Sequence, residues 1–221
     1  IEDHVVSEII AGLTRGCKNN GCALIGGETA QMPGFYADGE YDMAGTMVGV
    51  VEKTKMINGS RIRTGDVLIG LYSSGLHTNG YSLARRVLLE KFQLRTHVDE
   101  LGCTVGEELL KIHRSYLRPV SAVMEKITIK GISHITGGGI IENTLRVIPK
   151  KLKIDIDWSS WETPPVFELI QRLGNVPYED MIRTFNLGVG MILIVDKKDA
   201  DKTCKILKNK KEKPFIMGSV G

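Results

Sequence analysis

The sequence lacks the features that define several classes of protein. Its 29 Lys and Arg residues exceed its 26 Asp and Glu residues by a net charge of only +3, spread along the 221 residues. A strongly basic patch is the usual footprint of nucleic-acid binding, and the one basic run, 205–213, is typical of a solvated surface. No apolar run approaches a membrane span and no signal peptide is recognisable. We therefore expect neither a nucleic-acid nor a membrane partner.

Cysteine is also scarce and unpatterned. Cys17, Cys22, Cys103 and Cys204 form no Cys-x-x-Cys pair and have no histidine at zinc spacing. A disulfide framework and a thiolate metal site are both poorly supported. The pattern predicts a reducing, cytoplasmic setting.

Length and turn signals predict two domains. At 221 residues with 42% hydrophobic residues the chain can bury a real core. The turn Asn58-Gly59-Ser60 and the connector after it place the boundary between domains 1–60 and 61–221. The chain opens directly into a helical pattern, which suggests that it begins inside a longer protein.

The first domain is expected to hold one helix and two strands. Asp3 is the predicted N-cap of a helix that ends near Asn19. A short apolar run at 23–25 predicts a buried strand, and the alternating, Val-rich segment 43–52 predicts another.

Strand and helix patterns interleave along the chain, which predicts an α+β fold of two α/β-layered domains. Residues 93–106 are expected to be irregular, 107–126 helical with a break near Pro119, and 152–156 an edge strand. The remaining predicted strands are 67–71, 132–135, 191–195 and 215–220, and the remaining predicted helices are 81–92, 140–147, 166–173, 178–183 and 197–208.

The 25 glycines are clustered, and three of the clusters follow predicted strands. Gly26 and Gly27 precede Glu28, and two further clusters occupy 73–80 and 136–139. Glycine lets a ligand approach the backbone, and backbone N–H groups bind anions. There is no Gly-Lys-Ser/Thr of a Walker A loop. The pattern indicates a phosphate-bearing ligand, with Glu28 placed for a divalent metal; the alternative for the first cluster is a tight turn with an exposed Glu28.

Two histidines, His77 and His134, fall in glycine-rich loops. Each taken alone is typical of a structural histidine. No role is assigned to His4, His97 or His113, the last of which is predicted to be helical. Asn186 precedes Gly188-Val189-Gly190 and reads as a helix C-cap or turn residue.

Four motifs together resemble the aminoimidazole ribonucleotide synthetase family, the phosphoribosylformylglycinamidine cyclo-ligases of purine biosynthesis. They are Gly-Gly-Glu-Thr-Ala-Gln-Met-Pro-Gly at 26–34, Ser-Ser-Gly-Leu-His-Thr-Asn-Gly at 73–80, His-Ile-Thr-Gly-Gly-Gly at 134–139 and Arg-Thr-Phe-Asn-Leu-Gly-Val-Gly at 183–190. The first block separates this family from relatives in the same ATP-binding superfamily. The resemblance runs essentially from end to end.

The resemblance implies an enzyme that closes formylglycinamidine ribonucleotide to 5-aminoimidazole ribonucleotide, with ATP as substrate and Mg²⁺ as cofactor. It also implies a cytoplasmic homodimer. The implied roles are catalytic for Glu28 and His134, metal binding for Glu28, ATP or phosphate binding for Gly26, Gly27, Thr29, Thr136, Gly137, Gly138 and Gly139, and substrate binding for His77, Asn79, Asn186, Gly188 and Gly190.

One departure from the family is large. The family's chain begins earlier, with a glycine-rich nucleotide loop and Asp/Asn motifs that this sequence does not contain. We therefore expect an incomplete N-terminal ATP-binding domain, a complete C-terminal domain, and an inactive chain when alone. The alternatives are a non-catalytic nucleotide- or phosphate-binding module, or another enzyme of the superfamily such as formylglycinamidine synthetase, selenophosphate synthetase or thiamine-monophosphate kinase.

Overall fold

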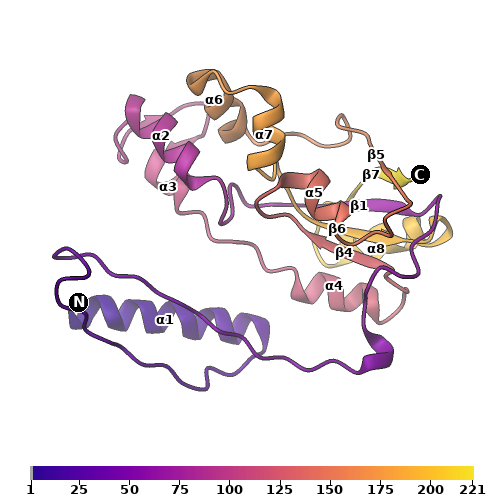
Figure 1. Cartoon of the computed structure of the whole chain (residues 1–221), viewed down its shortest axis with the longest axis horizontal. Helices are drawn as coiled ribbons and strands as arrows, with labels where there is room; N and C mark the ends of the chain where they lie inside the picture. Colours follow the sequence, from indigo (N-terminus) through magenta and orange to yellow (C-terminus); the bar gives the residue numbers. More distant parts are fainter. Residues whose placement is uncertain (1) are drawn as a thin grey trace. The chain divides into compact units, whose positions relative to one another are not determined.

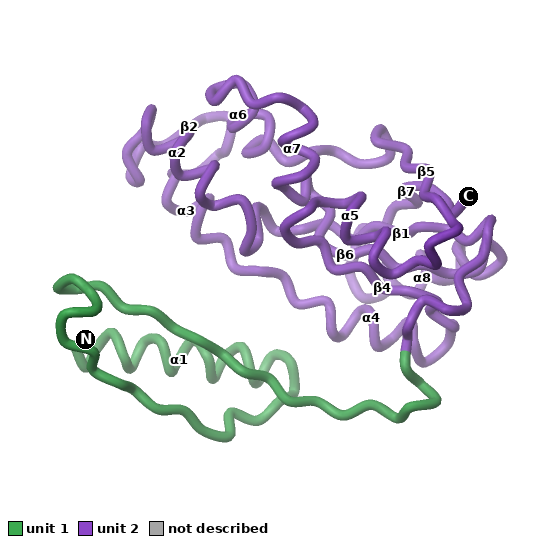
Figure 2. Tube along the Cα trace, viewed as in Figure 1, with its two compact units in different colours: residues 1–56 green, residues 57–221 purple. Residues whose placement is uncertain are grey.

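The computed structural model describes residues 2–221. The chain divides into two compact units, residues 1–56 and 57–221 (Figure 2). The unit limit falls four residues before the domain boundary predicted at 60/61. That boundary stays a prediction.

Unit 1 is built around one helix. The helix α1 (Asp3–Asn20) has Glu2 as its N-cap, so the prediction that Asp3 caps it is wrong by one residue. It ends as expected, because Gly21 takes the left-handed conformation (φ 65°) and donates its N–H to the last turn. The only other regular element among the described residues of unit 1 is the 3-10 helix η1 (Lys53–Lys55). No described residue of unit 1 is buried.

The two strands predicted in unit 1 are wrong. Residues 23–25 and 43–52 form no strand in the structure, and Ile25 and Val50 are 90% and 101% exposed. Valine and isoleucine favour strands because they pack well on a pleated, half-buried surface. No described residue of unit 1 supplies that surface or the pairing strand, so propensity alone does not form a sheet.

Unit 2 confirms the predicted α+β fold (Figure 1). Its strands are β1 (Val67–Tyr72), β2 (His97–Val98), β3 (Cys103–Thr104), β4 (Gly131–His134), β5 (Ile154–Ile156), β6 (Val189–Val195) and β7 (Phe215–Val220). Its helices are α2 (Tyr81–Lys91), α3 (Val105–Leu109), α4 (Leu117–Met124), α5 (Gly139–Leu145), α6 (Pro165–Gly174), α7 (Tyr178–Thr184), η2 (Lys197–Asp199) and α8 (Ala200–Asn209). Most of these elements lie within a few residues of the predicted ranges.

The main sheet has the strand order β4-β6-β1-β7-β5, so β5 is an edge strand as predicted. Both β1 and β4 run antiparallel to β6, which lies between them. Hence β1 and β4 are parallel, and their carboxyl ends meet the start of β6 at one edge: Tyr72 pairs with Val189 and His134 with Met191. This edge carries the candidate site.

Both faces of the sheet are covered, and period-2 alternation decides which residue faces where. Ile69 of β1 and Leu193 of β6 pack in one apolar cluster with α4 and α8. Leu68 and Ile192, their neighbours in sequence, pack in another with Ile140 of α5. Burial on two sides is why these strands read as continuous apolar runs.

A further apolar cluster joins α2, α3, α6 and α7 at one end of unit 2 (Figure 1). The small hairpin β2–β3 lies in the segment predicted to be irregular, so that prediction missed two short strands. Each of these strands has only two residues, too few to show the alternating pattern of a strand.

The long helix predicted at 107–126 is broken earlier than expected. The helix α3 ends at Leu109 and α4 begins at Leu117, so residues 110–116 form a non-helical connection. Pro119 does not cause the break: it lies in the first turn of α4, where a missing N–H costs little. His113 is therefore in a connecting segment, and its predicted place on a helix is wrong.

Candidate functional site

Three glycine-rich segments meet at the sheet edge where β1 and β4 end. Residues 73–80 follow β1, residues 136–139 follow β4, and residues 186–190 lead into β6. Strand pairing fixes this convergence, because Tyr72 and His134 pair with neighbouring residues of β6. The second, third and fourth sequence motifs are thus brought together by the sheet.

Asn186 ties two of these segments together. Its side-chain Nδ2 donates to the carbonyl oxygens of Gly75 (2.9 Å) and Leu76 (3.2 Å). Its Oδ1 accepts from the Ser73 hydroxyl (3.0 Å) and from the Gly188 amide (2.8 Å). The residue is 3% exposed. Every hydrogen-bonding atom of this amide side chain is used within the fold, so Asn186 shapes the site by clamping its loops.

Asn79, in the segment 73–80, makes a similar connection to the segment 136–139. Its Oδ1 accepts from the Gly137 amide at 3.0 Å. The amides of Gly138 and Gly139 donate to the carbonyl oxygens of Arg183 and Thr136. The backbone N–H groups of this glycine cluster therefore have partners inside the chain, and Gly137 is the exposed one whose partner could be exchanged for a ligand atom.

Close packing explains two of the glycines. Gly139 has φ +66°, and an added Cβ would lie 1.7 Å from the Ile182 carbonyl oxygen. At Gly190 a Cβ would lie 1.9 Å from the Tyr116 hydroxyl and 2.7 Å from Cε1 of His77. Both positions exclude any side chain. Gly190 thereby makes the space in which the His77 ring lies.

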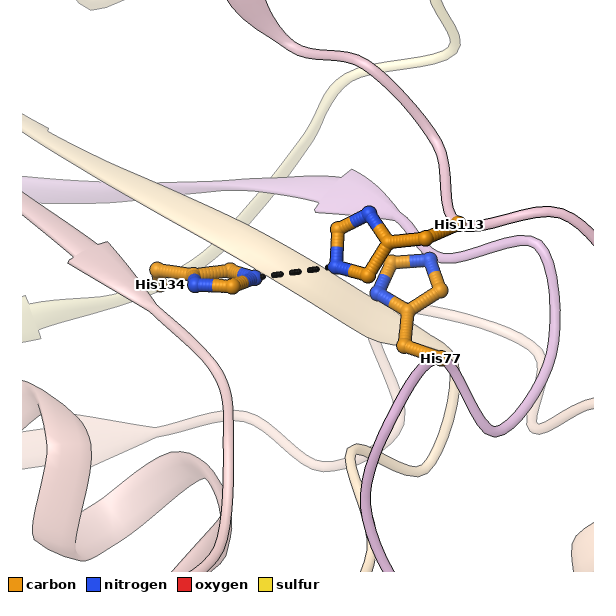
Figure 3. Close-up of side chains that lie close together, drawn as sticks. All are labelled: His77, His113 and His134. Atoms are coloured by element: carbon orange, nitrogen blue, oxygen red, sulfur yellow. Dashed lines mark hydrogen bonds between the residues drawn. The ribbon is translucent and has the colours of Figure 1, made fainter. Parts of the chain in front are cut away.

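The structure brings three histidines together at this edge (Figure 3). The rings of His77 and His113 stack with centroids 3.8 Å apart and 30° between their planes. Nε2 of His113 lies 3.2 Å from Nε2 of His134. His77 is buried, His113 half-buried and His134 exposed, so the cluster leads from the core to the surface.

Burial keeps the inner histidine neutral. It lowers the pKa of His77 to about 4, with smaller contributions from repulsion by the cationic forms of His113 and His134 and by Arg114. Burial and then His113 also lower the pKa of His134 from its ordinary value. The Ser74 amide donates to Nε2 of His77 (3.0 Å), so the neutral ring carries its proton on Nδ1, which has no partner.

One nitrogen from each ring lies within 4.8 Å of the others, as in a metal site. The ring orientations do not suit one. Nitrogen lone pairs lie in the plane of each ring, so the stacked rings of His77 and His113 aim theirs side by side instead of at a common point. Nε2 of His77 is also used by the Ser74 amide. The arrangement is a hydrogen-bonded and stacked cluster.

The predicted site residues of the first motif belong to unit 1. Gly26, Gly27, Glu28 and Thr29 are all exposed in a loop. A Cβ added at either glycine would meet nothing within 4 Å. These four residues adjoin one another within unit 1, whereas the histidine cluster belongs to unit 2.

Sequence reasoning missed His113 and Tyr116. Tyr116 donates its hydroxyl to the Tyr72 carbonyl (2.8 Å) and closes the inner side of the histidine cluster. Neither residue lies in a glycine-rich motif, and the segment 110–116 read as part of a helix. A histidine flanked by Ile112 and Arg114 carries no local signal, so only the tertiary contact with His134 shows its place.

Comparison with known proteins identifies the family. Residues 63–221 match the model of the AIR synthase related protein, C-terminal domain, and residues 1–51 that of the N-terminal domain. The phosphoribosylformylglycinamidine cyclo-ligase of Caldicellulosiruptor bescii is 49% identical to the chain, and the match covers 97% of the chain and 64% of that protein. The enzyme of that name from Syntrophotalea carbinolica is 50% identical, covering 96% and 61%.

Among solved structures, E. coli HypE aligns with a TM-score of 0.48 and 16% identity, covering 73% of this chain and 45% of that one. The chain spans less than two thirds of the length of the two curated relatives named above. The family models, however, match it almost throughout. The chain therefore belongs to the AIR synthase related protein family, as its four motifs predicted.

Proposed function

We propose that the protein formed by this chain at the full length of its relatives is a phosphoribosylformylglycinamidine cyclo-ligase. It closes formylglycinamidine ribonucleotide to 5-aminoimidazole ribonucleotide and converts ATP to ADP and phosphate. The observation that carries the proposal is the convergence of three family motifs, with His77 and His134, at one sheet edge. Relatives that bear this name at 49% and 50% identity support it.

The proposed reaction needs positioning more than a nucleophile. The formyl amide oxygen attacks the γ-phosphorus of ATP, an O–P bond forms, and the bond to ADP breaks. The amidine nitrogen then attacks the activated carbon, the bond from carbon to the phosphate oxygen breaks, and the nitrogen loses a proton. Holding two ends of one substrate together and neutralising phosphoryl charge account for most of such catalysis.

In unit 2, His134 is the proposed catalytic residue, because it is the exposed member of the histidine cluster and is mostly neutral near pH 7. It accepts the proton that the attacking nitrogen releases. Asn79 contacts the substrate beside it. Buried His77 takes part in substrate binding from beneath the stacked His113 ring, while Asn186 with Gly188 and Gly190 shapes that region. Phosphate is contacted by Thr136, Gly137, Gly138 and Gly139. The exposed Gly137 amide gives up its hydrogen bond to Oδ1 of Asn79 and donates to a phosphate oxygen instead.

In unit 1, Glu28 is the proposed Mg²⁺ ligand and second catalytic residue, and Gly26, Gly27 and Thr29 contact ATP phosphates. The donor set fits: Mg²⁺ is held by one or two carboxylates together with substrate phosphates, and the exposed Glu28 is next to a hydroxyl and two unobstructed glycines. The ion supplies charge neutralisation on the transferring phosphoryl group. Imidazoles suit softer metals, so the histidine cluster is not its site.

The proposal includes a cytoplasmic homodimer that binds neither nucleic acid nor membrane. The near-neutral composition supports the absence of a nucleic-acid partner, and the four free cysteines support a reducing setting. The homodimer rests on the family resemblance alone. Among the described residues, no helix is long and apolar enough to cross a bilayer.

The test is an ADP-release assay with formylglycinamidine ribonucleotide and Mg-ATP. It is run on this chain and on a fusion that adds the N-terminal residues of the Caldicellulosiruptor bescii relative. We expect turnover in the fusion and none in this chain. His134→Asn in the fusion should lower kcat by about 10²-fold or more, as for loss of a general base.

The control is His97→Asn, an exposed histidine on β2, which should leave turnover unchanged. A folded fusion that binds ATP and substrate but forms no product would contradict the proposal. It would favour a non-catalytic binding module. Turnover by this chain alone would contradict the assignment of an incomplete ATP-binding domain.

A further inference from the structure

His113 lies in the connection 110–116, and the hydrogen bond made by its Nδ1 atom shows which ring nitrogen carries the proton. Nδ1 of His113 lies 2.9 Å from the carbonyl oxygen of Arg114. A carbonyl oxygen only accepts hydrogen bonds, so Nδ1 carries the proton. In the neutral ring, Nε2 is then an acceptor, and this nitrogen faces His134.

The state of His134 follows from that of His113. The two Nε2 atoms are 3.2 Å apart, and a hydrogen bond between them needs one proton. Because Nε2 of neutral His113 has none, Nε2 of His134 is the donor. Neutral His134 therefore keeps a free lone pair on Nδ1. Figure 3 shows the His134 ring directed at His113, whose ring stacks on His77.

We propose that His113 is a positioning residue for His134: it holds the imidazole by its Nε2–H and so presents Nδ1 as the proton acceptor in ring closure. The inference rests on the proposed function of His134. It assigns His113 the part that an orienting third group plays beside a general base.

The same bond strengthens during the reaction. When Nδ1 of His134 takes a proton, its Nε2–H becomes a cationic donor, and charge-assisted hydrogen bonds are about twice as strong as neutral ones. An imidazole nitrogen acceptor carries no negative charge, so this stabilisation is smaller than a carboxylate would supply.

The position of His113 is itself held. Its inner face stacks on buried His77. The backbone carbonyl oxygen of Arg114 accepts the hydrogen bond from Nδ1–H of His113. The Arg114 guanidinium is paired with Glu212 at 2.7 Å, and the Glu212 side chain is only 8% exposed. The ionisable groups beyond His113 are thus neutral His77 and a neutralised Arg114–Glu212 pair. A stacked ring, a backbone acceptor and an ion pair fix one ring orientation.

The test compares two substitutions of His113. His113→Phe keeps a flat ring for stacking on His77 and removes the acceptor, whereas His113→Gln keeps an acceptor amide oxygen. The matched control is His97→Phe on β2, which faces no ring of the cluster. Nitrogen-15 NMR of histidine side chains at pH 8, on this chain, reports the tautomer of His134 and whether its Nε2–H is protected from exchange.

We expect a protected Nε2–H of His134 in the wild-type chain, in His97→Phe and in His113→Gln, and its loss in His113→Phe. In the fusion protein His113→Phe should lower kcat about tenfold, a part of the 10²–10⁴ that a general base contributes, with KM unchanged. His113→Gln should restore most of that loss.

The proposal is overturned if His113→Phe leaves both the His134 signal and kcat unchanged, or if Phe and Gln lower activity equally with a raised KM. Circular dichroism shows whether each variant folds. If His113→Phe does not fold, His113→Gln alone is the test, and loss of its protected His134 Nε2–H would overturn the proposal. A protected Nε2–H in a fusion without turnover would contradict the proposed function while leaving the hydrogen-bond assignment intact. An unprotected Nε2–H of His134 in a fusion with normal turnover would contradict only the positioning role of His113.

Discussion

The glycine-rich motifs of the two units look alike in sequence and differ in structure. In unit 1, Gly26 and Gly27 have free space where a side chain would be. In unit 2, Gly139 and Gly190 are pressed against the Ile182 carbonyl and the Tyr116 hydroxyl. Glycine at positions 139 and 190 is thus required by the chain's own packing. At positions 26 and 27 no described neighbour requires it, so a substitution there reports on ligand binding instead of folding.

The largest expected effect is from Gly139→Ala. The left-handed φ and the contact with the Ile182 carbonyl add strain and overpacking, each about 1–3 kcal/mol. Unit 2 should lose about 3 kcal/mol or more of unfolding free energy in urea followed by circular dichroism. The matched control is Gly137→Ala, whose Cβ would lie 3.6 Å from Oδ1 of Asn79 at an ordinary φ. If both variants lost the same unfolding free energy, close packing would not be the reason for glycine at position 139.

Asn186→Ala should come next. The change leaves the Leu76 carbonyl oxygen and the Gly188 amide without their partner, whereas the Ser73 hydroxyl keeps its hydrogen bond to the Gly75 carbonyl oxygen. Buried groups left unpaired cost about 1–3 kcal/mol each, with partial relief from water, so we expect about 3 kcal/mol. Asn79→Ala removes a single bond to the exposed Gly137 amide and should cost about 1 kcal/mol. Similar midpoints in urea for the two variants would contradict the clamp role of Asn186.

Acid should weaken unit 2 through its buried histidine. The folded pKa of His77 is about 4, below the ordinary value near 6.5. Between these values the unfolded chain binds more protons than the folded chain, so stability falls as pH falls. The loss attributable to His77 is about 2 kcal/mol by pH 5. His134, whose pKa is also lowered, acts in the same direction.

Urea midpoints measured from pH 7.5 to 5 check this loss. His77→Asn should flatten the profile, because Asn tolerates the left-handed φ of 58° at this position. His97→Asn should not. A profile that stays steep in His77→Asn would place the responsible groups elsewhere.

The smallest effect on stability is expected in unit 1. Gly26→Ala and Gly27→Ala meet no atom within 4 Å, so unfolding should change by about 0.5 kcal/mol or less, as for surface substitutions. In the fusion protein the same changes, and Glu28→Gln, should weaken Mg-ATP binding measured by calorimetry. Unchanged binding would remove the first motif from the nucleotide site.

How far prediction succeeded depends on where burial occurs. The strands β1, β6 and β7 and the helices α2, α6 and α8 were predicted because their apolar residues face a core within unit 2. The segments 23–25 and 43–52 carry equally strong strand patterns and form none. Their apolar side chains have no covering layer in the described chain, and pattern predicts structure only where a partner surface completes it.

The family, the fold class and the three loops of the site in unit 2 follow from the sequence by itself, because motifs, glycine positions and hydrophobic period are local properties. The tertiary structure alone decided that His113 joins His77 and His134, that Asn186 closes on residues 73–76, and that Gly139 touches Ile182. These contacts join residues distant in sequence, and their partners are chosen by strand pairing and by the path of the connection 110–116. No local pattern encodes that choice.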